Sequence, residues 1–159
     1  MSFDLVLCAT DLSREEGAAW RSAARLVRTL NARARILHVI EPVAFPYPAE
    51  GPGIDELQER LRSDLLSEAR RAVRSRLASL QQEWAEEIRP ENIEAVIALE
   101  GVAADTILIE AERAAADMIL VFNRPRGPLR RLLLGSVAQQ VVSDARIPVV
   151  VLPIGGGKR

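Results

Sequence analysis

Two polar stretches that follow apolar runs carry the residue types that a phosphorylated sugar would need. Thr10 and Asp11 come directly after one apolar run, and Arg124 and Arg126 come shortly after another. A carboxylate accepts hydrogen bonds from sugar hydroxyls, whereas arginine side chains and the backbone amides of a helix start bind phosphate. Gly135-Ser136 would supply such a helix start. Aspartates and serines before helices also serve as ordinary caps, so the spacing alone leaves ligand binding and capping both open.

The chain contains few residues that could take part in catalysis. Cys8 and His38 are the only residues of their types, which leaves no internal disulfide, no zinc cluster and little basis for a catalytic triad. The only lysine is Lys158, so a phosphate-loop lysine and an internal Schiff-base amine are both missing. We therefore expect no catalytic residue and no metal site, with Cys8 an inert core thiol and His38 a hydrogen-bonded core histidine.

Apolar runs that alternate with amphipathic segments place these residues in a parallel sheet. Strands are predicted at 5–9, 36–40, 93–99, 118–122 and 147–153, and helices at 13–27, 54–88, 101–111 and from 135 onward. This alternation favours right-handed crossovers, so the predicted fold class is α/β: a doubly wound, mostly parallel, five-stranded open sheet with helices on both faces. Such sheets bind ligands beyond the carboxyl ends of their strands, where Asp11 and Arg124 lie.

The first helix has a sequence signal for its start. Ser13-Arg14-Glu15-Glu16 fits a capping box, in which the serine caps the helix and the last glutamate reaches back to the backbone of the serine. We therefore expect this helix to begin immediately after Ser13.

Length and composition fit one globular domain. The 159 residues are 48 % apolar and 27 % charged, and we assign 1–154 to a single domain and 155–159 to a disordered tail. A helix from 55 to 88 would be about 50 Å long against a domain width of roughly 40 Å, so its first turns are expected to fray, bend or meet a partner. The net charge of −1 and the lack of a long apolar run predict no nucleic-acid partner, no membrane insertion and a cytosolic location.

Four segments of the chain are similar to the universal stress protein family, and together they span nearly the whole sequence. They are 5–13 (LVLCATDLS), 36–40 (ILHVI), 129–137 (LRRLLLGSV) and 147–151 (IPVVV). The resemblance implies an open sheet with strand order 3-2-1-4-5, a cytosolic dimer and, in one subgroup, bound ATP. It also implies that Asp11 contacts ribose, that the backbone of Val39 contacts adenine and that Gly135-Ser136 contact phosphate.

The phosphate motif of that ATP-binding subgroup is only partly retained. The motif is a glycine, two residues, a second glycine, nine residues and a glycine followed by serine or threonine. Counted back from Gly135-Ser136, its first two glycines correspond to Phe122 and Pro125. Proline has no amide hydrogen, and losing a hydrogen bond to a charged group costs about 1.5–3 kcal/mol, or roughly ten- to a hundredfold in affinity. The phenyl ring of Phe122 either fills the pocket or packs elsewhere.

The basic stretch after Phe122 leaves two interpretations of the site open, because its arginines either hold phosphate in place of glycine amides or form a solvated turn. These arginines are Arg124, Arg126, Arg130 and Arg131. The complete candidate nucleotide site is Thr10, Asp11, Val39, Arg124, Arg126, Gly135, Ser136 and Val137.

Three functions follow from these alternatives. The preferred one is a non-catalytic stress-response module whose nucleotide site has degenerated, which needs no cofactor and acts through dimerisation and contacts with an unknown protein partner. The second is an ATP-binding regulator with an altered phosphate loop. The third, a weak ATPase, lacks a His-x-Gly-His pattern, a Ser-Gly-Gly loop and any internal lysine.

The last predicted strand suggests how the chain dimerises. The implied order places it at a sheet edge, and its residues Val149, Val150, Val151 and Leu152 carry no charge. An uncovered apolar edge invites pairing with another chain. We predict a two-fold homodimer through this strand, which Val150→Lys is expected to convert to monomer.

Overall fold

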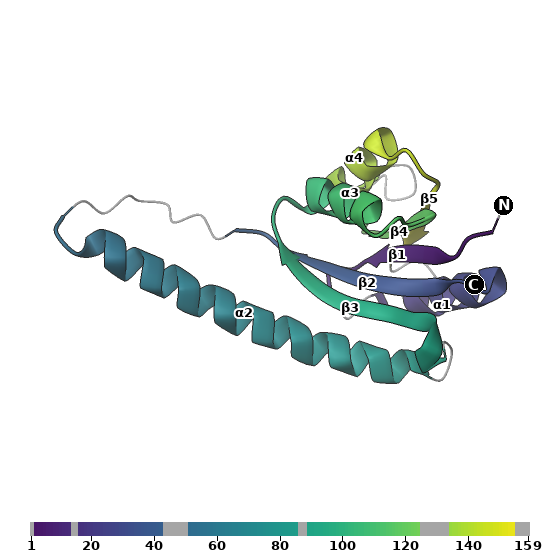
Figure 1. Cartoon of the computed structure of the whole chain (residues 1–159), viewed down its shortest axis with the longest axis horizontal. Helices are drawn as coiled ribbons and strands as arrows, with labels where there is room; N and C mark the ends of the chain where they lie inside the picture. Colours follow the sequence, from purple (N-terminus) through teal and green to yellow (C-terminus); the bar gives the residue numbers. More distant parts are fainter. Residues whose placement is uncertain (1, 14–15, 43–50, 86–88, 125–133, 155–159) are drawn as a thin grey trace.

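Five parallel strands form one sheet in the order β3-β2-β1-β4-β5, which confirms the order implied by the family resemblance (Figure 1). The computed structural model describes residues 2–13, 16–42, 51–85, 89–124 and 134–154. The strands are β1 (Leu5–Ala9), β2 (Arg33–Ile40), β3 (Ile93–Glu100), β4 (Met118–Asn123) and β5 (Val149–Pro153). Each neighbouring pair is parallel, so the sheet predicted to be mostly parallel is parallel throughout.

Helices cover both faces of the sheet, as expected for a doubly wound fold. They are α1 (Gly17–Leu30), α2 (Ile54–Ala85), α3 (Ala103–Arg113) and α4 (Ser136–Asp144), and a short 3-10 helix, η2 (Pro90–Asn92), precedes β3. Val6 and Cys8 of β1 pack in one core with α1 and α2, whereas Leu5 and Leu7 pack in a second core with α3 and α4. Both faces of β1 are therefore apolar, which is why the sequence of this strand lacks alternation.

The long helix α2 is only partly attached to the sheet. It is unbroken over 32 residues, or about 48 Å at 1.5 Å per residue. Its second half buries Val73 and Leu77, whereas Leu57, Leu61 and Leu65 in the first half are exposed by 66 %, 50 % and 39 %. Figure 1 shows this first half extending beyond the sheet. The helix therefore reaches past the sheet, as its length led us to expect, and it is continuous from Ile54 onward, while the partner for its first turns stays a prediction.

The predicted capping box of α1 is wrong. The α-helix begins at Gly17, directly after Glu16 in 3-10 conformation, and the Glu16 side chain accepts from the Asp11 N–H instead of from the backbone of Ser13. The Ser13 N–H instead donates to Asp11 Oδ1 at 2.8 Å, in a local turn. Since that donor is already satisfied, the Glu16 carboxyl accepts from other groups near the end of β1.

Of the helices that the structure describes, none combines the length and the apolar character needed to cross a bilayer.

Candidate functional site

A cavity of about 800 Å³ opens at the carboxyl ends of β1, β2 and β4, beside the start of α4. It lies where the strand order reverses, because β1 is flanked by β2 on one side and β4 on the other. Seven predicted site residues line it: Thr10, Asp11, Val39, Arg124, Gly135, Ser136 and Val137. Arg126, Arg130 and Arg131, like Pro125, lie outside the described residues, and so does the tail 155–159.

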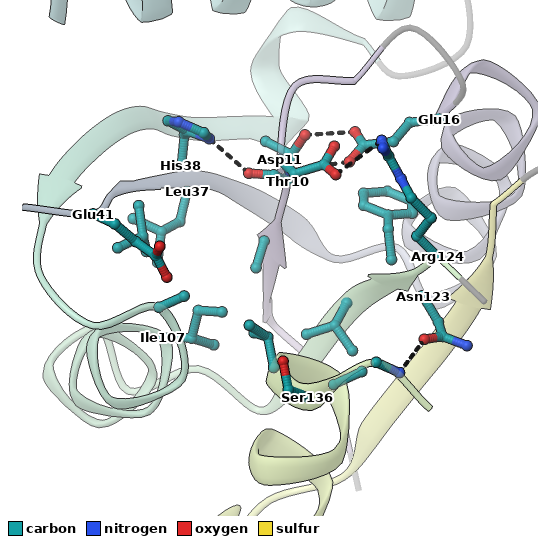
Figure 2. A pocket seen from close by; sticks show the side chains of 18 of the residues that line it. Thr10, Asp11, Glu16, Leu37, His38, Glu41, Ile107, Asn123, Arg124 and Ser136 are labelled. Carbon is teal, nitrogen blue, oxygen red and sulfur yellow. Dashed lines mark hydrogen bonds and ion pairs between the residues drawn. The ribbon is translucent and has the colours of Figure 1, made fainter. Parts of the chain in front are cut away.

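One part of the cavity wall is apolar and is drawn from several elements. Its side chains come from β2, α3, β4 and α4, and include Leu37, Val39, Ile107, Val121, Val137 and Ala138. Carboxyl, guanidinium and hydroxyl groups lie on other parts of the wall, where Figure 2 shows Asp11, Arg124 and Ser136. An apolar wall with a few polar groups suits a ligand that has a flat ring and a polar end.

Asp11 and Arg124 join the loops that follow β1 and β4. Arg124 Nη2 lies 3.1 Å from Asp11 Oδ2, as Figure 2 shows. Partial burial works to raise the pKa of Asp11, but hydrogen bonds with Glu16 and Ser13 and the charge of Arg124 outweigh it, so the pKa is lowered. Asp11 is therefore ionised at neutral pH and available as a hydrogen-bond acceptor.

The start of α4 is bonded to a side chain of β4. The Gly135 N–H donates to Asn123 Oδ1 at 2.7 Å (Figure 2). A Cβ at Gly135 would lie 3.4 Å from that same oxygen, which is an ordinary van der Waals contact. The amide that the family resemblance assigns to phosphate therefore already has a partner within the protein.

Phe122 leaves the cavity open. Its ring packs edge-to-face against Trp20, with ring centroids 4.2 Å apart and an interplanar angle of 63°. Trp20 belongs to the core beneath α1, and the partly buried Phe122 packs against that core while also lining the cavity. Of the two outcomes expected for this ring, filling the pocket or packing elsewhere, the contact with Trp20 corresponds to the second.

Glu16 is the site residue that the sequence analysis missed. It lines the cavity, yet the residue is only 1 % exposed. Burial raises the pKa of its carboxyl to about 8, and the neighbouring Asp11 contributes to this rise. The capping-box pattern drew attention to Glu16 but assigned it the wrong partners; a tryptophan one helical turn later, at position 20, was the available signal.

Cys8 is the buried thiol that the sequence predicted, whereas His38 makes the expected hydrogen bond but is half-buried and lines the cavity, so it is not a core histidine. His38 Nδ1 lies 2.8 Å from the carbonyl oxygen of Thr10. Since a carbonyl only accepts, Nδ1 carries the proton in this contact. Cys8 is fully buried in β1, and burial raises the pKa of its thiol to about 12, which makes it unreactive.

The strand order and the cavity define a class of protein: an open parallel α/β domain with a ligand cavity at its switch point. The chain belongs to the universal stress protein family, whose family model matches residues 2–153. Universal stress protein MJ0531 of Methanocaldococcus jannaschii is 30 % identical over 148 residues, which cover 92 % of this chain and 80 % of that protein. Stress response protein NhaX of Bacillus subtilis is 27 % identical over 164 residues, covering 94 % and 97 %.

Solved structures of this family share the fold at lower identity. Universal stress protein UspA from Lactobacillus plantarum has a TM-score of 0.67 and 24 % identity, covering 96 % of this chain and 99 % of that one. A universal stress protein in complex with cAMP has a TM-score of 0.61 and 17 % identity, covering 96 % and 98 %. The protein from Archaeoglobus fulgidus in complex with dAMP has a TM-score of 0.54 and 21 % identity, covering 96 % and 99 %.

Proposed function

We propose that this chain is a non-catalytic regulatory module that binds an adenine nucleotide, with a phosphate end that differs from the family motif. The observation that carries the proposal is the open cavity of about 800 Å³, which is lined by Asp11, Val39 and Gly135-Ser136 together. These are the positions to which the family resemblance assigns ribose, adenine and phosphate. Two family structures were solved with the nucleotides cAMP and dAMP, which supports a nucleotide as the ligand.

The proposed orientation follows from the chemistry of the cavity wall. The base lies against the apolar side chains near Val39 and Ile107, and Asp11 accepts hydrogen bonds from ribose hydroxyls. Arg124 supplies a positive charge for phosphate, although it already contacts Asp11. A bound phosphate would have to share Arg124 with that carboxylate.

A second function, the module with a degenerate nucleotide site, is supported by a different observation. The Gly135 N–H is bonded to Asn123, and Pro125 has no N–H to offer. A phosphate would have to displace the Asn123 side chain or bind without this amide. In that case the protein would act through dimerisation and an unknown protein partner and would need no cofactor.

Calorimetric titration with ATP and magnesium separates the two functions. We expect binding with a Kd below about 1 mM, which Asp11→Ala weakens about tenfold because a hydrogen bond to a charged group is lost. Glu91→Ala, which changes an exposed carboxylate of η2, is the matched control and should bind like the wild type. No heat at millimolar ATP would remove the nucleotide function and leave the degenerate one.

Assembly and location complete the proposal. We infer a two-fold homodimer through the edge strand β5, where Val149, Val150, Val151 and Leu152 are only half-buried. A cytosolic location, as the family resemblance implies, belongs to the same proposal. The absence of catalysis is proposed because Cys8 is enclosed and His38 contacts a backbone carbonyl.

A further inference from the structure

Glu16 connects three segments of the chain beside the cavity. Its carboxyl accepts hydrogen bonds from the Thr10 hydroxyl at the end of β1 and from the Asp11 N–H at 3.0 Å (Figure 2). It also accepts from the indole N–H of Trp20 in α1 at 2.9 Å. A buried carboxyl that accepts from three donors restrains the conformation of the turn that supplies two of them.

We propose that Glu16 is a positioning residue of the nucleotide site, which fixes the turn that carries Asp11 and whose proton is linked to the binding of an anionic ligand. The positioning role concerns the chain alone. The link to ligand binding rests on the proposed nucleotide function.

The conformation of the turn shows why it needs such support. Leu12 has a φ of 61°, in the left-handed region that branched side chains rarely adopt. Its N–H donates to Thr10 Oγ1 at 2.9 Å, and that hydroxyl in turn donates to Glu16. The backbone on both sides of Asp11 is therefore tied to one carboxyl group. Strained turns of this kind persist only where surrounding bonds over-determine them.

The charges around Glu16 determine how its proton affects a ligand. The charged group that contacts it is Asp11 in the same turn, and Asp11 is paired with Arg124 at the end of β4. His38 of β2 bonds the carbonyl of Thr10, the residue whose hydroxyl donates to Glu16. Burial and a side-chain hydrogen bond with Asp11 raise the pKa of Glu16 to about 8 and outweigh the bonds from the Thr10 hydroxyl and the Asp11 N–H, which work to lower it. The carboxyl is therefore mostly neutral at pH 7 and gains a negative charge above pH 8. A second negative charge beside Asp11 disfavours phosphate, so an anionic nucleotide binds more weakly at high pH.

A ligand-free measurement tests the positioning role. The chain contains two tryptophans, and the indole N–H signal that is absent in Trp20→Phe identifies Trp20 in a proton–nitrogen NMR spectrum. Between pH 5 and 10, this signal should move with a midpoint near 8 in the wild type and should stay fixed in Glu16→Gln. Glu41→Gln, which removes an exposed carboxylate from the same cavity, is the matched control and should retain the transition.

The wild-type titration is decisive even if Glu16→Gln does not fold. A Trp20 signal that stays constant across this pH range would overturn the proton link, because Glu16 would then keep one charge state throughout. A transition that persists unchanged in a folded Glu16→Gln protein would overturn the positioning role, because Trp20 would then report on another group.

Titration with ATP tests the proton link. Affinity should fall about tenfold between pH 7 and pH 9 in the wild type and in Glu41→Gln, but less than about twofold in Glu16→Gln. Equal falls in all three proteins would overturn the link. If none of them binds millimolar ATP, the proposed function and the link both fail, whereas the NMR result still decides whether Glu16 holds the turn.

Discussion

At the scale of single residues, Glu16 makes stability depend on pH. The pKa of its carboxyl is about 8 in the folded chain, against an ordinary value of 4.5. Between these values the folded state keeps a proton that the unfolded state releases, so the free energy of unfolding falls as the pH rises from 4.5 to 8. Glu16→Gln cannot titrate. Its stability relative to the wild type should therefore rise by an amount on the order of 3 kcal/mol between pH 5 and pH 9.

Urea unfolding of both proteins at pH 5, 7 and 9 measures this difference. The titration of Asp11 does not affect this comparison. Its pKa is lower in the folded than in the unfolded chain, so its contribution to stability is fully present at pH 5 to 9 and is lost only in acid. A difference between the two proteins that is the same at all three pH values would show that Glu16 is ionised throughout in the folded chain.

At the scale of elements, one arginine holds β2, β3 and α3 together. Arg35 of β2 bonds Glu94 of β3 through two nitrogens and lies 2.7 Å from Glu110 of α3. The Glu110 side chain is only 3 % exposed, and Arg113 is a more distant partner at 3.7 Å. Arg35→Met would leave that buried carboxylate poorly paired and should destabilise the fold by about 3 kcal/mol in urea unfolding.

A double variant separates the ion pair from the loss of packing. Arg35→Met with Glu110→Met removes both buried charges, so most of the lost stability should return. Recovery of less than about 1 kcal/mol would place the loss in the arginine stem or in Glu94 instead.

The two halves of α2 should respond differently to the same substitution. Leu77→Ala removes a side chain that is 3 % exposed and should cost about 2–4 kcal/mol of stability. Leu61→Ala, at a position that is 50 % exposed on the same helix, is the matched control and should change stability by no more than about 0.5 kcal/mol. Equal losses of stability in urea unfolding would mean that another chain covers the first half of α2 in solution. This is one of the outcomes expected from the length of the helix.

The elements were easier to predict from sequence than the contacts between them. Continuous apolar runs marked β1 and β4 because both faces of these strands are covered, and helical spacing marked α2. β2 begins at Arg33, three residues before the predicted strand, because polar Arg35 lies where β3 and α3 each offer it a carboxylate. Glu110, one of the two partners of Arg35, is 75 residues away in the sequence, so local sequence patterns could not predict this contact.

In the candidate site too, the location was predicted from sequence but one of the contacts was not. The topology rule placed the loops of Asp11 and Arg124 at one cavity, and the structure brings them into contact. The role of Glu16 could not be derived from spacing, because it depends on the turn at Leu12 that turns the Asp11 N–H toward the carboxyl.

At the scale of the whole molecule, the two edge strands of the sheet are similarly half-buried but differ in charge. β3 contacts α2 and carries Glu94 and Glu100, whereas β5 contacts α1 and α4 and consists of uncharged residues. The backbone of β5 alternates in direction. The Pro148 carbonyl accepts a hydrogen bond from β4, and the Ile154 N–H donates one to β4. The backbone N–H and C=O groups of even-numbered residues therefore point toward β4, and those of odd-numbered residues point away from the sheet. Pro153 already occupies one outward position, where an N–H is not needed.

This alternation provides a second test of the proposed dimer, which removes a backbone donor and adds no charge. Val150 packs against the core beneath α1, and Val151 packs against the core of α3 and α4. Val151→Pro removes an outward N–H while keeping the bonds to β4, so it should convert the dimer to monomer in sedimentation analysis without unfolding the chain. Ala98→Pro is the matched control on the opposite edge. Gly101 N donates to Ile40 O, so alternation turns the Ala98 N–H outward as well, and this variant should remain dimeric. A dimer that survives Val151→Pro but is lost in Ala98→Pro would move the interface from β5 to β3.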